Sequence, residues 1–118
     1  MCPINPKRGD VWKVDFNPTQ GDEIFKVRPA IVLSSDAIGK LNLKIVVPIT
    51  KWKSGFSNDL WHIQLMPSNE NGLTKTSAAD MLQVRSVDIR RFIEKIGNIR
   101  EAQMEELLQA LAIVLEWS

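Results

Sequence analysis

The chain has 118 residues, 44% of them hydrophobic and 25% charged, with a formal net charge of +1, and this composition predicts one globular domain over residues 1–118. No apolar run approaches the roughly 20 residues of a membrane-spanning helix and the N-terminus has no signal-peptide pattern, so we expect a cytoplasmic protein without a membrane segment. A single cysteine, Cys2, and a single histidine, His62, exclude an internal disulfide and argue against a metal site.

The first half of the chain predicts three strands and one long polar connection. In residues 12–16, apolar and polar side chains alternate, which is typical of a half-buried strand. Residues 17–27 contain Asn-Pro and Gln-Gly pairs and therefore predict a loop or a long hairpin. Residues 30–33 and 45–49 are short, continuous apolar runs, as expected for central strands.

The second half predicts shorter elements. Residues 61–65 alternate again and give a fourth strand, whereas residues 66–76 have turn chemistry without periodicity and predict a loop. We expect residues 77–84 to form a fifth strand, residues 86–91 one short helical turn and residues 92–96 a last short strand.

One helix is predicted at the C-terminus, after a break at Gly97 and Asn98. Its apolar residues follow the spacing of one helical face. They are Met104, Leu107, Leu108, Leu111 and Leu115. Five or six short strands with one packed helix predict a mainly β fold with α (α+β), a small and strongly bent barrel of SH3-like type.

Charge is unevenly distributed along the chain. Residues 1–53 hold nine Lys and Arg against five Asp and Glu, or +4, and residues 54–118 hold six against nine, or −3. The basic half is a candidate face for a polyanion, and the acidic end fits a solvated helix surface. Because this excess is small, any contact with nucleic acid should be local and shape-dependent.

Two residues of the basic half, Arg28 and Thr50, suit a phosphate group. Arg28 stands at the entrance of the second predicted strand and Thr50 at the exit of the third. A guanidinium and a hydroxyl that face each other across a groove offer hydrogen-bond donors to phosphate oxygens. Taken alone, Arg28 fits a surface cation equally well.

Five motifs follow one another along the chain. They are R-G-D-V-W-K-V-D-F-N-P-T-Q-G-D-E at 8–23, V-R-P-A-I-V-L-S at 27–34, V-V-P-I-T at 46–50, G-L-T-K-T-S-A-A-D-M-L-Q-V-R-S-V-D at 72–88 and E-K-I-G-N-I at 94–99. In this order and spacing they resemble the MazF/PemK family of toxin endoribonucleases over nearly the whole chain.

The resemblance implies a fold, an activity and partners. It implies an SH3-like barrel, a homodimer, and sequence-selective cleavage of single-stranded messenger RNA without a metal or other cofactor. It also implies a cognate antitoxin, which should block the groove with an acidic, partly disordered segment. In the family, the arginine and threonine at two of these motif positions are the catalytic pair, which carries over to Arg28 and Thr50. Attack by the 2′-hydroxyl of RNA should leave a 2′,3′-cyclic phosphate and a 5′-hydroxyl.

The residue that removes the proton from the 2′-hydroxyl is harder to assign. An arginine with a pKa above about 12 is a poor base at neutral pH, so we expect Arg28 to stabilise charge. Many family members carry a carboxylate directly before the glutamine that corresponds to Gln83, where this chain has Leu82. Asp80 lies two residues earlier and would face the same side of a regular strand, which makes it a candidate substitute base or RNA contact.

Further side chains around this pair are candidates for RNA binding. They are Gln20, Gly21, Lys51, Trp52, Lys53, Ser77, Gln83 and Arg85. Trp52 lies between two lysines directly after Thr50, a combination that suits base stacking and phosphate contact and fits an antitoxin contact equally well. An ion pair of Arg85 with Asp88 or Asp15 is an alternative to its RNA contact.

The remaining aromatic and imidazole side chains have simpler interpretations. Trp12, Trp61 and Trp117 occupy or follow apolar positions and are expected to pack in the core. His62 lies on the polar face of its predicted strand, and we expect it to be exposed.

Two other functions stay open at this point. A toxin of CcdB type is related in fold, inhibits DNA gyrase and does not cut RNA, but the presence of both Arg28 and Thr50 speaks against it. A non-catalytic SH3-like module would instead bind a peptide in an aromatic groove.

Overall fold

The computed structural model describes residues 4–18, 20–24, 26–38 and 42–117, so Cys2 lies outside the described residues. Its main elements are β1 (Asp10–Asp15), β2 (Val27–Val32), β3 (Leu43–Lys51), β4 (His62–Leu65), β5 (Ser77–Asp80), β6 (Arg85–Asp88), β7 (Phe92–Asn98) and helix α1 (Glu101–Val114). The mainly β fold with a C-terminal helix that the sequence predicts is confirmed, with seven strands in the described part of the chain in place of five or six.

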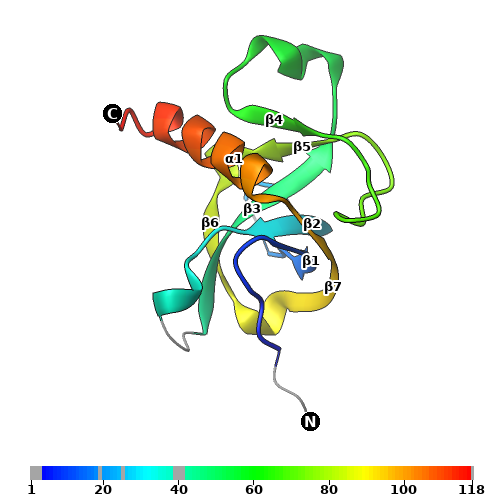
Figure 1. Cartoon of the computed structure of the whole chain (residues 1–118), viewed down its shortest axis with the longest axis vertical. Coiled ribbons are helices and arrows are strands. Elements are labelled where there is room, and N and C mark those ends of the chain that lie inside the picture. The colour runs from blue at the N-terminus through cyan, green and yellow to red at the C-terminus, as the bar shows by residue number, and fades with distance from the viewer. Residues whose placement is uncertain (1–3, 19, 25, 39–41, 118) are drawn as a thin grey trace.

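Strand β3 is the centre of the sheet because it pairs with three neighbours. The strand order is β4-β5-β3-β2-β1-β7, with β6 also paired to β3, and neighbouring strands are antiparallel. Residues 43–46 of β3 pair with β6, whereas residues 49–51 pair with β5. The sheet therefore bends around β3 into the small barrel-like shape of Figure 1.

The central strands bury both of their faces, which explains their continuous apolar runs. One core cluster packs against α1 and includes Val11, Ile31, Val47, Ile49, Met104 and Leu107. A second cluster includes Val14, Phe16, Val32, Val46 and Phe92. Neighbouring residues of β2 and β3 thus alternate between two separate apolar environments. Trp12 and Trp61 pack against these clusters and stay partly exposed.

The predicted strand over residues 77–84 is wrong in its second half. Strand β5 ends at Asp80, and Met81–Gln83 form a 3-10 turn. The Asp80 carboxylate accepts a hydrogen bond of 3.1 Å from the Leu82 N–H and so competes with the sheet for the backbone. The chain then re-enters the sheet as β6, and the predicted helical turn over residues 86–91 is reduced to Ile89–Arg91.

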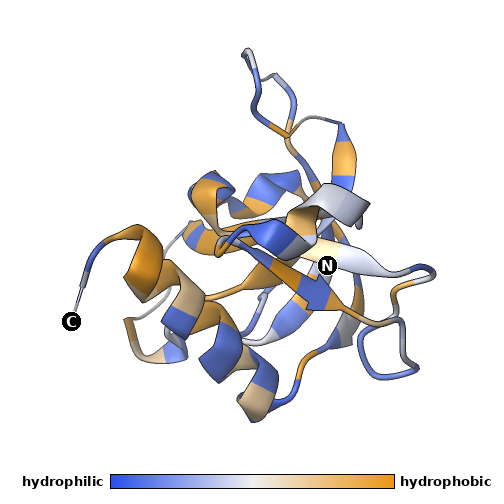
Figure 2. Cartoon of the chain, turned by 90° about the horizontal axis from the view of Figure 1, so that it is seen from above, coloured by the Kyte–Doolittle hydropathy of each residue, from blue (hydrophilic) through white to orange (hydrophobic). Residues whose placement is uncertain are grey.

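Helix α1 buries fewer side chains than its periodicity predicts. Met104, Leu107 and Ala110 are buried, whereas Leu108 is 38% and Leu115 66% exposed. The packing expected for Trp117 is wrong, since this residue lies beyond the helix and is 77% exposed. Figure 2 shows the apolar residues that gather at the C-terminal end of the helix.

Two further observations concern the ends of elements and the membrane. Gly97 and Asn98 belong to β7, so the break before the helix falls at residues 99–100, two residues later than predicted. Within the described ranges, no helix has both the length and the hydropathy needed to cross a membrane.

Candidate functional site

A cavity of about 370 Å³ opens between β1, β2, β3, β7 and the connection from β4 to β5. Its lining comprises Lys13, Arg28, Pro29, Ile49, Thr50, Lys51, Gly72, Leu73, Thr74, Lys75, Ser77 and Ile96. The lining combines apolar side chains with four cations and three hydroxyls, and it contains no carboxylate. Such a site favours a ligand that carries negative charge and also has an apolar surface.

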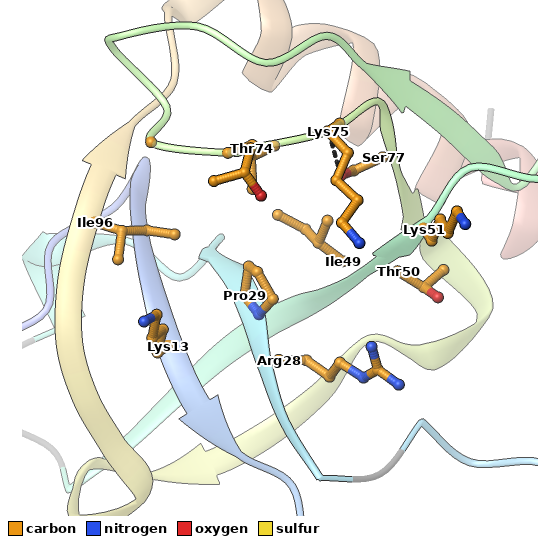
Figure 3. A pocket seen from close by; sticks show the side chains of 12 residues that line it. Lys13, Arg28, Pro29, Ile49, Thr50, Lys51, Thr74, Lys75, Ser77 and Ile96 are labelled. Atoms are coloured by element: carbon orange, nitrogen blue, oxygen red, sulfur yellow. Dashed lines mark hydrogen bonds between the residues drawn. The ribbon is translucent and has the colours of Figure 1, made fainter.

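Arg28 and Thr50 lie at this cavity because of the pairing between β2 and β3. Ala30 pairs with Pro48, and the same register continued by two residues aligns Arg28 with Thr50. Prolines at positions 29 and 48 have no N–H to donate, and the paired part of the two strands ends at this point. Figure 3 shows the Arg28 guanidinium and the Thr50 hydroxyl on the same side of the cavity.

The opposite wall of the cavity is a loop that a buried asparagine holds in shape. Asn71 is 2% exposed, and its Oδ1 accepts hydrogen bonds from the backbone N–H groups of Ser68 at 3.0 Å and Leu73 at 2.9 Å. Its Nδ2 donates to the Met66 carbonyl at 2.8 Å. The loop therefore presents Gly72, Leu73, Thr74 and Lys75 to the cavity from a fixed backbone.

The structure brings together only some of the side chains that the sequence suggests. Arg28, Thr50, Lys51 and Ser77 line the cavity. Gln20, Gly21, Trp52, Lys53, Asp80, Gln83 and Arg85 lie outside its lining. Three polar lining residues were missed by the sequence reading, namely Lys13, Thr74 and Lys75. Thr74 and Lys75 belong to the loop without periodicity, and the only indication that they line the cavity is that they lie close to Ser77 along the chain.

Gln83 fastens the connection between β1 and β2 to the 3-10 turn. Its Oε1 accepts a hydrogen bond from the Ile24 N–H at 3.1 Å, and its Nε2 donates to the Asp22 carbonyl at 2.9 Å. Both ends of the amide are thus bound to the backbone of this connection, which leads directly into the strand that carries Arg28. Gln83 supports the conformation of the connection.

Two more of the predicted RNA contacts have partners within the chain. The Arg85 guanidinium carbon lies 5.7 Å from the centre of the Phe16 ring, a cation–π distance. Asp88, one of the ion-pair partners considered for Arg85, is instead bound by Arg90 at 3.0 Å. Trp52 is half-buried, with its ring edge-on to Phe56 at 5.6 Å between centroids.

The expectation of an exposed His62 is wrong. Its side chain is 9% exposed and lies between two carboxylates, with Nδ1 2.7 Å from Asp59 and Nε2 3.4 Å from Asp80. Its ring stacks on Phe56 with the centroids 3.6 Å apart. His62 therefore joins the connection between β3 and β4 to β5, and Asp80 belongs to this cluster and not to the lining of the cavity that holds Arg28 and Thr50.

The two carboxylates around His62 have opposite pKa shifts. Burial is the largest influence on the pKa of Asp80 and raises it above 3.8, although His62 and the Leu82 N–H act in the other direction. Burial also acts to raise the pKa of Asp59, but the hydrogen bonds and charge of His62 outweigh it, so this pKa lies below 3.8. Asp59 is thus the carboxylate that stabilises the cluster in its ionised form.

Replacing Asp59 with asparagine should lower the free energy of unfolding at pH 7 by about 1–3 kcal/mol, because His62 loses a charge-assisted hydrogen bond. The pKa of Asp59 is lower in the folded protein than its ordinary value of 3.8. The stabilisation by Asp59 is therefore complete above pH 3.8 and is lost as the pH falls through the lower pKa of the folded state. Urea unfolding of wild type and variant between pH 3 and pH 7 measures the difference, with the exposed Glu105→Gln as control. A pH-independent difference would contradict the assignment.

Comparison with known proteins gives one consistent result. The sequence pattern of the family described as "PemK-like, MazF-like toxin of type II toxin-antitoxin system" matches residues 7–115. Endoribonuclease MazF9 of Mycobacterium tuberculosis is 30% identical over 119 residues, which cover 95% of this chain and 98% of that protein.

Solved structures agree with this match. The crystal structure of MazF (Form-I) from Deinococcus radiodurans superposes with a TM-score of 0.80 and 25% identity, over 97% of this chain and 99% of that one. A MazE–MazF crystal structure (Form-II) from the same organism gives a TM-score of 0.74 and 26% identity, over 98% and 100% of the chains.

Proposed function

The chain belongs to the family of PemK-like, MazF-like toxins of type II toxin–antitoxin systems, and we propose that Arg28 and Thr50 are the residues with which it cuts single-stranded RNA. It is a toxin with endoribonuclease activity, as the family and the relative MazF9 indicate. The observation that supports the proposed site is the joint position of both residues in a cavity with four cations and no carboxylate. A gyrase inhibitor or a peptide-binding module is not favoured by this lining.

RNA supplies its own nucleophile for the reaction. The 2′-oxygen forms a bond to the neighbouring phosphorus while the bond from phosphorus to the 5′-oxygen breaks, which leaves a 2′,3′-cyclic phosphate and a 5′-hydroxyl. The 2′-hydroxyl loses its proton to solvent and the departing 5′-oxygen gains one from solvent, so no water is consumed and the protein must supply orientation and charge stabilisation. A metal ion is not needed for any of these steps.

Arg28 and Thr50 have separate roles in this reaction. The planar guanidinium of Arg28 can donate two parallel hydrogen bonds to phosphate oxygens and can stabilise their negative charge. The hydroxyl of Thr50 can donate to a further phosphate oxygen or accept from the attacking 2′-hydroxyl. Asp80, expected as a substitute base, has its carboxylate bound by His62 and the Leu82 N–H, so we assign it no proton transfer.

The nature of the products tests this function directly. Purified protein should cut a long, unstructured RNA in the presence of EDTA, and the 3′-ends should carry a cyclic phosphate that mass spectrometry detects. An RNA with 2′-O-methyl groups at the mapped cleavage sites should stay intact, because it lacks the nucleophile. Cleavage of the methylated RNA, or cleavage only with added metal, would exclude the proposed reaction.

We assign two partners to the chain in addition to cytoplasmic messenger RNA. An antitoxin with an acidic, partly disordered segment would complement the cationic cavity. The MazE–MazF crystal structure from Deinococcus radiodurans, with a chain 26% identical to this one, supports such a partner. A second copy of the chain would cover exposed apolar side chains of the C-terminal region, among them Leu108, Ile113 and Leu115. Sedimentation equilibrium should give twice the mass of one chain; the mass of a monomer at micromolar concentration would contradict the homodimer.

A further inference from the structure

Lys75 extends into the cavity from the wall that faces Arg28. Figure 3 shows its side chain reaching from the connection between β4 and β5 across the cavity toward Thr50, while Arg28 approaches the same space from β2. No pattern in the sequence singles out Lys75, because it lies in a loop without periodicity. Lys75 and Arg28 thus bring cationic groups to the same cavity from different elements.

Two hydrogen bonds hold the backbone at Lys75 and at the residue that follows it. The Ser77 hydroxyl donates a hydrogen bond of 2.8 Å to the Lys75 carbonyl, and the Trp52 N–H donates one of 3.2 Å to the Thr76 carbonyl. Ser77 is itself paired with Lys51 in the sheet. Because its main chain is tied to the strand that carries Thr50, Lys75 keeps a fixed attachment point relative to this hydroxyl.

The charge of Lys75 is available to a ligand. Within the part of the chain that the structure describes, no carboxylate lies within 4.0 Å of its amino group, whereas Lys13 at the same cavity is bound to Glu94 at 3.0 Å. The ammonium group has three hydrogen-bond donors. Lys75 therefore differs from Lys13, whose charge is already compensated.

We propose that Lys75 is a further catalytic residue, which donates to a non-bridging oxygen of the scissile phosphate from the side opposite Arg28. This role rests on the proposed cleavage of RNA by Arg28 and Thr50. During attack the phosphate gains negative charge as the fifth oxygen bonds to phosphorus, and two cations on opposite walls stabilise this charge more than they stabilise the substrate. In this role Lys75 donates hydrogen bonds to the phosphate and transfers no proton.

Single-turnover cleavage of a short RNA that contains one mapped site tests the role. Lys75→Met should lower the rate at saturating RNA about 100-fold, as expected for the loss of one preorganised donor to a developing anion. Lys75→Arg keeps the charge and should be at least about tenfold faster than Lys75→Met. Lys7→Met removes the same charge from an exposed residue outside the cavity and should stay within about twofold of wild type.

Binding of the same RNA with a 2′-O-methyl group at the scissile nucleotide separates catalysis from affinity. The dissociation constant of Lys75→Met should stay within about threefold of that of Lys7→Met, since one phosphate contact is lost from many. Equal cleavage rates for Lys75→Met and Lys7→Met would overturn the role of Lys75, and so would a Lys75→Met variant that loses only RNA affinity. In either case, cleavage by the wild-type protein would still support the proposed function. Equally slow Lys75→Arg and Lys75→Met variants would also overturn it. A wild-type protein that leaves the RNA intact would overturn the proposed function and Lys75 with it.

Discussion

Replacing Arg28 with alanine should lower the rate of RNA cleavage by about 1,000-fold or more, because the reaction loses a bidentate charged donor to the phosphate. The guanidinium is carried by β2 at the cavity that Thr50 also lines. The measurement is the single-turnover rate in EDTA at saturating RNA, where a loss of affinity does not lower the rate. Circular dichroism checks that the variant is folded.

Two control variants accompany Arg28→Ala: the first keeps a positive charge at position 28 with a different geometry, and the second removes a guanidinium elsewhere on the protein. Arg28→Lys keeps the charge but loses the planar fork, and it should retain a rate between those of wild type and Arg28→Ala. Arg90→Ala removes a guanidinium that is 87% exposed and lies outside the cavity, so cleavage should be unaffected. If Arg28→Ala cleaves as fast as Arg90→Ala, Arg28 has no part in the chemistry.

Replacing Gly72 with alanine should destabilise the protein by about 3 kcal/mol or more, because the new methyl group has no space. A Cβ at Gly72 would lie 2.0 Å from the carbonyl oxygen of Ile96. The backbone of Gly72 also has a φ of +70°, a left-handed conformation that residues with a Cβ rarely adopt. Gly97 of β7 packs against the same loop, and a Cβ at Gly97 would lie 2.3 Å from the Glu70 carbonyl oxygen. Backbone therefore packs directly on backbone between this loop and β7.

Denaturant unfolding measures this cost, and the chain offers a matched control. Gly55 has open space around the position of a Cβ and no positive φ, so Gly55→Ala should change the free energy of unfolding by less than about 0.5 kcal/mol. Equal stabilities of Gly72→Ala and Gly55→Ala would contradict the close packing. Because Gly72 also lines the cavity, RNA cleavage by the folded fraction reports whether the wall has moved.

The sequence predicts the strands of this fold where side-chain periodicity alone decides. The alternation over residues 12–16 and the apolar runs over 30–33 and 45–49 correspond to β1, β2 and β3, since the central strands are buried on both faces. The position of Arg28 beside Thr50 could also be predicted, because antiparallel pairing of consecutive strands places the start of one opposite the end of the other.

The errors arise where a side chain acts on the backbone or on a distant segment. Asp80 ends its strand by binding the Leu82 N–H, an interaction that apolar periodicity does not contain. His62 does lie on the polar face of its strand, but Phe56 and Asp80 cover it from other elements. Lys75 reaches the cavity because Asn71 and Ser77 shape its loop, and no local pattern reports such a tertiary arrangement.

The double hydrogen bond of Gln83 has a consequence for the exchange of segments between relatives. The connection from β1 to β2 and the turn at Gln83 are separated by about sixty positions in the chain, as the spacing of 59 between Ile24 and Gln83 shows, yet each depends on the other for its shape. A chimera that imports residues 20–24 in a different backbone conformation would leave the side chain of Gln83 without these two partners. In a chimera between two relatives, the two segments should therefore be exchanged together.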